Sequence, residues 1–145
     1  MKSTASAIWE GGLKDGKGRL TAESGVLKEA PYTFARRFEG AGTGTTPEEL
    51  IAAAHSACFA MALSADLGKA GFPPQRLSVH ATVTLEPVDG KPTVSSSALE
   101  LEAWVPGIDD AKFQETAAGA KANCPISRLL HTNITLTAKL ALATA

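Results

Sequence analysis

Apolar and polar residues alternate with a period of two along several stretches of the chain, and this pattern predicts strands there. Near the N-terminus it appears three times, between glycine-rich turns, over residues 4–9, 18–22 and 33–39. We interpret these segments as an antiparallel meander. The alternation is clearest over residues 77–85 and 99–105, which predicts two long strands joined near Asp89-Gly90.

A helical pattern lies between these two groups of strands. Thr46 is a good N-cap, Pro47 suits the first helical position, and Glu49 is placed to close a capping box. The apolar spacing continues to about Ala70, and Gly71 follows as a stop signal. The sequence therefore predicts one long central helix.

The middle of this helix is rich in alanine, which leaves it thin on nearly every face. High helix propensity explains the composition as well as a buried position does, in which sheet wraps around the helix. The pattern alone leaves both interpretations open.

The C-terminal third predicts two more helices and a strand. Asp109-Asp110 opens a helix that lasts until about Asn123, Cys124-Pro125 interrupts it, and a short helix resumes over residues 126–130. Alternating apolar residues over 134–142 predict a final strand. The order of elements indicates an α+β fold with antiparallel sheets rather than a doubly wound parallel sheet.

Composition narrows the class of protein. The 145 residues suit a single domain, 1–145, and 44% hydrophobic with 20% charged residues is globular composition. A net charge of -1 argues against a nucleic-acid-binding protein. The uncharged stretch 50–65 is too short and too polar for a membrane span, which needs about 20 mainly apolar residues. No apolar signal segment precedes Glu10, so we expect a cytoplasmic location.

The chain has only two cysteines, Cys58 and Cys124, and their spacing does not suggest zinc. In a reducing compartment, isolated cysteines are usually small buried hydrophobic residues. The apolar helix around Cys58 by itself raises a thiol pKa, whereas Cys124 precedes Pro125 as an N-cap, where free backbone N–H groups favour the thiolate. Local physics thus favours Cys124 as the more acidic thiol, although a cation near Cys58 could reverse that order.

Several strings at characteristic separations resemble the OsmC/Ohr family of thiol peroxidases, in particular its osmotically inducible OsmC branch. Nearly the whole chain takes part in the resemblance. The strings are Glu23-Ser-Gly-Val-Leu27, Pro31-Tyr-Thr-Phe34, Arg37-Phe-Glu-Gly40, Thr46-Pro-Glu-Glu-Leu50, Ala53-Ala-His-Ser-Ala-Cys-Phe59 and Asn123-Cys-Pro-Ile-Ser127.

The resemblance implies a peroxidatic cysteine at Cys58, a resolving cysteine at Cys124, a thiolate-stabilising Arg37 and a Glu48 that orients this arginine. It also implies reduction of organic hydroperoxides, and more weakly of hydrogen peroxide, at the expense of a dithiol of lipoyl or other type. No metal or flavin cofactor is implied. The family forms intertwined homodimers with sites at the subunit interface, so a second copy is the expected partner.

Arg36 and Glu49 are near alternatives to Arg37 and Glu48. If residues 33–39 form a strand, the two arginines point to opposite faces, so only one serves the site. Glu49 has a capping role available, which leaves Glu48 freer. Ten residues of helix rise about 15 Å, so Glu48 cannot touch the Cys58 of its own helix and is expected to serve the other subunit's.

Two other functions compete with the peroxidase. His55 lies three residues before Cys58 on one helical face, which would allow a hydrolase-type Cys–His pair. Alternatively, a dimer with inert cysteines could carry a hydrophobic small molecule. His80, His131 and the acidic pair Asp109-Asp110 have ordinary structural explanations and are not site candidates.

Overall fold

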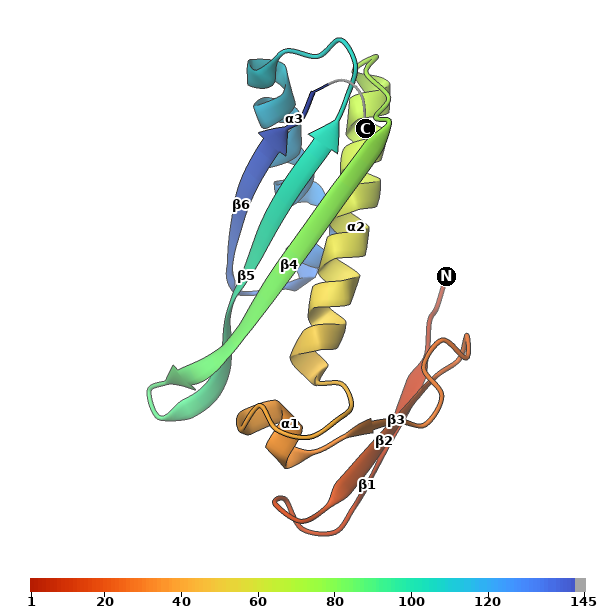
Figure 1. The fold of residues 1–145 in the computed structure, drawn as a ribbon, viewed down its shortest axis with the longest axis vertical. Coiled ribbons are helices and arrows are strands. Elements are labelled where there is room, and N and C mark those ends of the chain that lie inside the picture. The colour runs from red at the N-terminus through yellow and green to blue at the C-terminus, as the bar shows by residue number, and fades with distance from the viewer. Residues whose placement is uncertain (143–145) are drawn as a thin grey trace. The chain divides into compact units, whose positions relative to one another are not determined.

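The computed structural model describes residues 1–142 and divides into two compact units, Met1–Leu50 and the residues from Ile51 onward. Each unit contains one three-stranded sheet, with strand order β1-β2-β3 in the first and β4-β5-β6 in the second (Figure 1).

The first sheet is the expected meander, with its third strand in a different place. Strands β1 (Ala5–Glu10), β2 (Lys17–Ala22) and β3 (Ala30–Tyr32) pair antiparallel in sequence order. The Trp9 and Tyr32 rings lie 5.5 Å apart across Gly18, where any side chain would collide with the Tyr32 ring. Gly18 thus allows two aromatic rings to pack over the middle strand.

The prediction of a strand over residues 33–39 is wrong, because this segment forms helix α1 (Phe34–Phe38). Thr33 caps the helix, its Oγ1 accepting a hydrogen bond from the Arg36 N–H at 3.1 Å. Phe34 and Phe38 are four residues apart, a spacing that puts both on one face of a helix as readily as of a strand. Their rings lie 4.9 Å apart, and the argument that placed Arg36 and Arg37 on opposite strand faces no longer applies.

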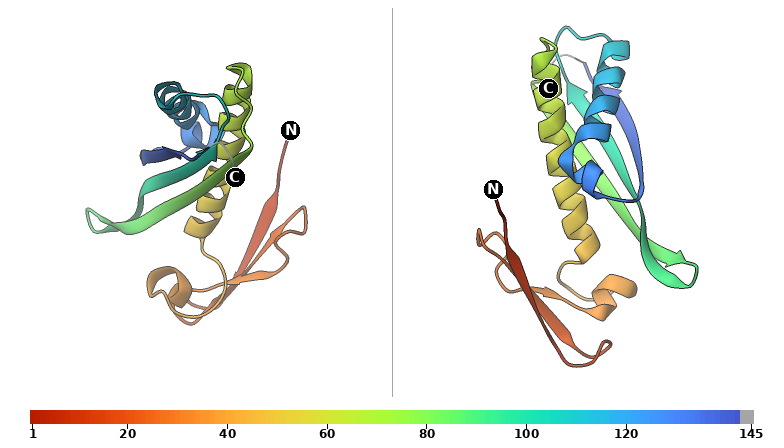
Figure 2. Two further views of the ribbon diagram at one scale, coloured as in Figure 1. Left: turned by 45° about the horizontal axis from the view of Figure 1, so that its top comes forward. Right: turned by 180° about the vertical axis from the view of Figure 1, so that it is seen from behind.

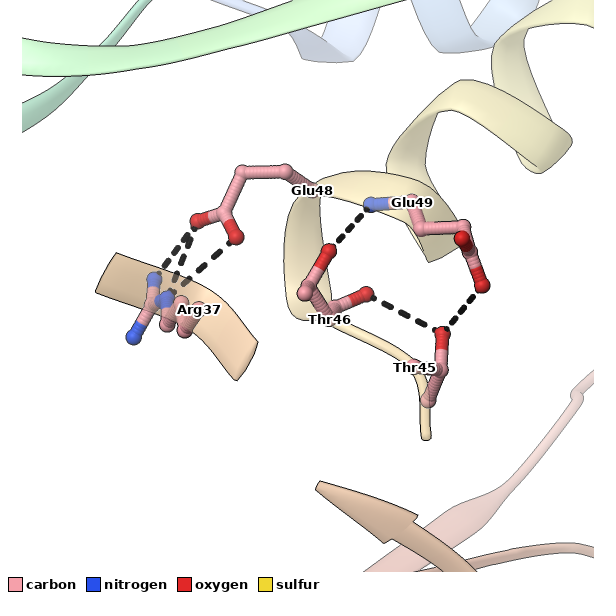
Figure 3. Close-up of polar contacts among 5 residues, drawn as sticks. All are labelled: Arg37, Thr45, Thr46, Glu48 and Glu49. Carbon is pink, nitrogen blue, oxygen red and sulfur yellow. Dashed lines mark hydrogen bonds and ion pairs between the residues drawn. The ribbon is translucent and has the colours of Figure 1, made fainter. Parts of the chain in front are cut away.

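Helix α2 (Pro47–Lys69) begins where the sequence predicts. The Thr46 hydroxyl accepts the Glu49 N–H at 3.0 Å, as an N-cap does (Figure 3). The capping box is not closed as expected, because the Glu49 carboxylate accepts the Thr45 hydroxyl instead, at 2.8 Å.

The second unit is built on a long hairpin. Strands β4 (Arg76–Val88) and β5 (Lys91–Trp104) pair antiparallel, and Asp89 and Gly90 turn the chain with φ of 51° and 75°. Two positive φ values match the twist of a two-residue hairpin turn. Helices α3 (Asp110–Asn123) and α4 (Pro125–Leu129) follow, then strand β6 (Asn133–Leu140).

The sequence also predicts wholly antiparallel sheets, whereas β6 pairs with β5 in parallel, Leu99 opposite Leu136 and Leu101 opposite Ala138. The reason is the crossover: α3 and α4 carry the chain back along β5, so that β6 begins opposite Ser96 and runs in the same direction as β5. A helical connection of this length is what parallel pairing requires. The α+β class holds, with one mixed sheet.

Helices α2 and α3 lie on the same face of the second sheet (Figure 2) and enclose its core. The largest fully buried apolar side chains come from α2, β5 and α3: Phe59, Leu63, Leu67, Leu99 and Phe113. Helix α2 is apolar and long enough to cross a membrane, but these contacts make it a core helix of a soluble fold. Ala53, Ala57 and Met61 on α2 are exposed.

Candidate active site

Cys58 and Cys124 lie side by side in the second unit, their sulfur atoms 3.1 Å apart. Both are free thiols, Cys58 partly exposed and Cys124 fully buried. Pro125 ends α3 and begins α4, so Cys124 is at once the C-cap of one helix and the predicted N-cap of the next. A disulfide has an S–S length of about 2.05 Å, so the thiols need approach each other by only about 1 Å to form one.

The two thiols differ in acidity in the direction that the sequence suggests. Burial raises the pKa of Cys58, and the hydrogen bond that its thiol shares with Cys124 raises it further, because the Cys58 proton is retained in this bond. Burial also acts to raise the pKa of Cys124, but hydrogen bonds from the Ser127 N–H, the Cys58 thiol, the Ser127 hydroxyl and the Ile126 N–H outweigh it, and this pKa is lowered. Within this unit Cys124 is therefore the more acidic partner.

His55 is fully buried in the same region, and both of its ring nitrogens are engaged. Nδ1 lies 2.7 Å from the Ser97 hydroxyl and Nε2 lies 2.8 Å from the Ser127 hydroxyl. Burial lowers the pKa of His55, which keeps the ring neutral. The hypothesis of a hydrolase-type Cys–His pair is wrong, because His55 bonds two serines and has no nitrogen left for Cys58.

Arg37 and Glu48 form an ion pair in the first unit (Figure 3). The Arg37 Nη2 and Nε atoms lie 2.7 Å and 3.1 Å from Glu48 Oε1, and Nε is 3.3 Å from Oε2. The Glu48 side chain is 8% exposed and that of Arg37 is 36% exposed. In residues 1–142 the pair occupies the Nε–Nη2 edge of the guanidinium, and the Nη1 donors make no hydrogen bond.

The alternative residues Arg36 and Glu49 are engaged with the loop between α1 and α2. The Arg36 Nε donates to the Gly44 carbonyl at 3.2 Å, and Glu49 accepts the Thr45 hydroxyl. Both contacts hold the chain that leads into α2. The structure thus brings together Cys58 with Cys124, and Arg37 with Glu48, each pair within one unit.

Sequence reasoning missed the two serines that contact His55. Ser127 follows Cys124 by three residues, the spacing of a residue in the first turn after an N-cap, and this signal could have drawn attention to it. Ser97 carries no such signal, because only the packing of β5 against α2 puts it beside His55. Among the described residues, no group of three or more His, Cys, Asp or Glu side chains could hold a metal ion.

Comparison with known proteins identifies the family to which this chain belongs. The family model described as OsmC-like protein matches residues 40–139. The chain belongs to the OsmC family. It is 52% identical, over 130 residues and 90% of each chain, to the protein named Peroxiredoxin OsmC of Escherichia coli strain K12.

More distant OsmC relatives cover nearly the whole chain. An organic hydroperoxide resistance protein of Xanthomonas axonopodis pv. citri is 33% identical over 140 residues, 95% of this chain and 94% of that protein. The crystal structure of the organic hydroperoxide resistance protein OhrB of Bacillus subtilis is 26% identical and superposes with a TM-score of 0.71, covering 95% of this chain and 98% of that one. The α+β fold is therefore that of this family.

Proposed function

We propose that this chain, an enzyme of the peroxidase class, reduces organic hydroperoxides, and hydrogen peroxide more weakly, with Cys58 as the peroxidatic and Cys124 as the resolving cysteine. The observation that carries the proposal is the 3.1 Å separation of these two free thiols in a member of the OsmC family. The names of the relatives supply the substrate class.

In the first step, the Cys58 thiolate attacks the outer oxygen of the hydroperoxide. An S–O bond forms and the O–O bond breaks, so that Cys58 becomes a sulfenic acid and the alkoxide leaves as an alcohol after taking up a proton. Burial raises the pKa of Cys58, so this nucleophile needs a nearby cation that stabilises its thiolate.

Arg37 is our candidate for that cation. A guanidinium always carries its charge, and its free Nη1 donors can stabilise both a thiolate and the leaving oxygen while Glu48 holds the opposite edge. Glu48 and Cys58 are ten residues apart on one helix, and we therefore expect the arginine of one subunit to serve the cysteine of its partner in a homodimer.

In the second step, the Cys124 thiolate attacks the Cys58 sulfenic sulfur. The S–S bond forms, the S–O bond breaks, and hydroxide leaves as water after protonation. A dithiol of lipoyl or other type then reduces the disulfide by exchange and is itself oxidised. Such recycling suits a reducing compartment, so we keep the cytoplasm as the expected location.

An apolar cavity beside Arg37 supports a substrate with a hydrocarbon tail. The cavity has a volume of about 280 Å³, and Trp9, Tyr32, Phe34 and Phe38 line it together with Arg37. An alkyl or aryl tail fits such a lining, because apolar surface leaves water while the polar head remains at the cation.

Intact-mass measurement after one equivalent of an alkyl hydroperoxide tests the proposal. We expect a loss of two hydrogens, from a Cys58–Cys124 disulfide, and turnover that Cys58→Ser abolishes. Cys124→Ser should react once and then accumulate sulfenic or sulfinic acid on Cys58. A chain that keeps its mass and both thiols would instead be the carrier with structural cysteines, and turnover by Cys58→Ser would remove Cys58 from the nucleophilic role.

A further inference from the structure

Cys58 and Cys124 form a pair of soft sulfur ligands without further ligating groups around them. Their sulfur atoms lie 3.1 Å apart, and both thiols are free. Within residues 1–142, no group of three or more His, Cys, Asp or Glu side chains could hold a metal ion. His55, on the same helix as Cys58, is engaged through both ring nitrogens by Ser97 and Ser127. A ligand that binds to the thiol pair must therefore be satisfied by two sulfur atoms alone.

The distance between the two sulfur atoms favours one ligand geometry. With bonds to sulfur of about 2.3 Å, a linear two-coordinate ion holds its two sulfur atoms about 4.6 Å apart, and a tetrahedral ion holds them about 3.8 Å apart. A pyramidal centre with bonds of similar length at nearly right angles holds them about 3.3 Å apart. The observed 3.1 Å is closest to the pyramidal centre, so the two thiols need to move very little to bind it.

Trivalent arsenic is a centre of this kind. It is soft, as are the thiolates that soft centres prefer, and it forms three bonds in a pyramid. When one of these bonds is made to an organic group, two remain for two thiols. Monosubstituted trivalent arsenicals thus match the pair in the number of ligands, in the ligand atom and in the distance between the sulfur atoms.

We propose that Cys58 and Cys124 bind monosubstituted trivalent arsenicals as a bidentate chelate, which blocks both thiols. With phenylarsine oxide, two As–S bonds form, the As=O bond breaks, and the oxygen leaves as water with the two thiol protons. Neither arsenic nor sulfur changes its oxidation state, so no oxidant or reductant takes part. The proposal concerns the reduced thiols and goes beyond the disulfide cycle proposed above.

The organic group of the ligand can point to solvent beside Cys58. Cys58 is partly exposed, whereas Cys124 is fully buried. Ala54, four residues before Cys58 on the same face of α2, is exposed, as are Ala57 and Met61. Alanine side chains leave space next to the thiol, and a methionine side chain is flexible. The arsenical therefore enters at Cys58, and its arsenic then bonds to Cys124 behind it.

Intact-mass measurement of the reduced chain with one equivalent of phenylarsine oxide tests the proposal. We expect one phenylarsenic group per chain with the loss of two hydrogens, and protection of both thiols from iodoacetamide. Excess glutathione should release the arsenical at least about a hundredfold more slowly from the wild type than from Cys58→Ser or Cys124→Ser, because the second bond of a chelate forms at a high effective concentration. The dithiol dimercaptopropanol should remove it from all three.

The controls separate a chelate within one chain from other forms of binding. Ser56→Ala, on the same helix as Cys58, is the matched control and should keep the slow release. A mixture of Cys58→Ser and Cys124→Ser chains should release the arsenical rapidly, because no chain in it has both sulfur atoms. Thermal unfolding verifies that the variants are folded. The stoichiometry in the wild type, one group that protects both thiols, decides the matter even where a variant does not fold.

Binding of two phenylarsenic groups per wild-type chain would overturn the proposal. Release from the wild type as fast as from the single-cysteine variants would do the same, as would slow release from their mixture. The outcome is distinguishable from that of the proposed function. If the chelate forms but a hydroperoxide produces no disulfide, the proposed function fails and the arsenical site stands. A disulfide without a chelate gives the reverse result.

Discussion

Arg36 and Arg37 are neighbours in the chain with different contacts. Arg37 pairs with the nearly buried Glu48, whereas Arg36 holds the Gly44 carbonyl of the loop before α2. In the sequence, only the resemblance to the family favoured Arg37 over Arg36 as the site residue. The strand-face argument failed because Phe34 and Phe38 fit a helix as well as a strand, and a short-range pattern does not distinguish the two over five residues.

At this scale we predict that Arg37→Ala slows the reaction of Cys58 with an alkyl hydroperoxide by about a hundredfold, the usual loss when a donor to developing negative charge is removed. Single-turnover kinetics at neutral pH measure the effect. Arg36→Ala is the matched control and should lose far less, because its side chain supports only the loop. Equal losses in the two variants would contradict the assignment of Arg37.

The elements followed the sequence wherever local signals agreed. Thr46 and Pro47 start α2, Asp109 caps α3, and Pro125 separates α3 from α4, all as predicted. Two elements departed from prediction. Helix α1 begins at the Thr33 cap, a local signal inside the segment that we predicted as a strand, whereas the parallel pairing of β6 depends on the path by which α3 and α4 return the chain to a position beside Ser96 on β5.

His55 joins three elements, and its protonation would break that junction. Because burial holds its pKa below the usual value of about 6.5, the unfolded chain takes up this proton at a higher pH than the folded chain does. The contribution of neutral His55 to the free energy of unfolding is therefore complete above about pH 6.5. It decreases as the pH falls below this value, by at most about 1.4 kcal/mol per pH unit.

We therefore expect the free energy of unfolding of the wild-type chain, from urea titrations, to fall between pH 7.5 and pH 5.5. In His55→Gln the same interval should produce a smaller fall, even though this variant starts from a lower stability at pH 7.5. A pH dependence as steep as that of the wild type would show that the proton is taken up elsewhere.

The whole molecule holds the proposed active site as two pairs in separate units. The cysteines belong to the second unit, and Arg37 with Glu48 belongs to the first. That residues 1–145 form a single domain stays a prediction. The homodimer also stays a prediction. The resemblance to the family and the ten-residue spacing on α2 both favour a site completed by the partner subunit.

Mixed dimers of two inactive variants test this arrangement. If Arg37 acts across the interface, a dimer of one Cys58→Ser chain and one Arg37→Ala chain has one of its two sites intact. Random mixing of the chains should then recover about a quarter of the wild-type peroxidase activity, as expected for a two-fold symmetric dimer. If Arg37 acts within its own chain, mixing recovers nothing, and sedimentation of the mixture verifies that dimers form.

The sequence by itself determined the class of fold, the long helix with its cap, the hairpin and the cysteine that starts α4, because caps, turns and periodicity act over a few residues. Short motifs that resemble the family also identified Cys58, Cys124, Arg37 and Glu48 as candidate site residues. Only the tertiary structure decided that the two thiols lie 3.1 Å apart, that Arg37 bonds Glu48, and that His55 bonds Ser97 and Ser127. These contacts join residues 11 to 72 positions apart, and their geometry depends on how helices pack on a sheet, which no local pattern contains.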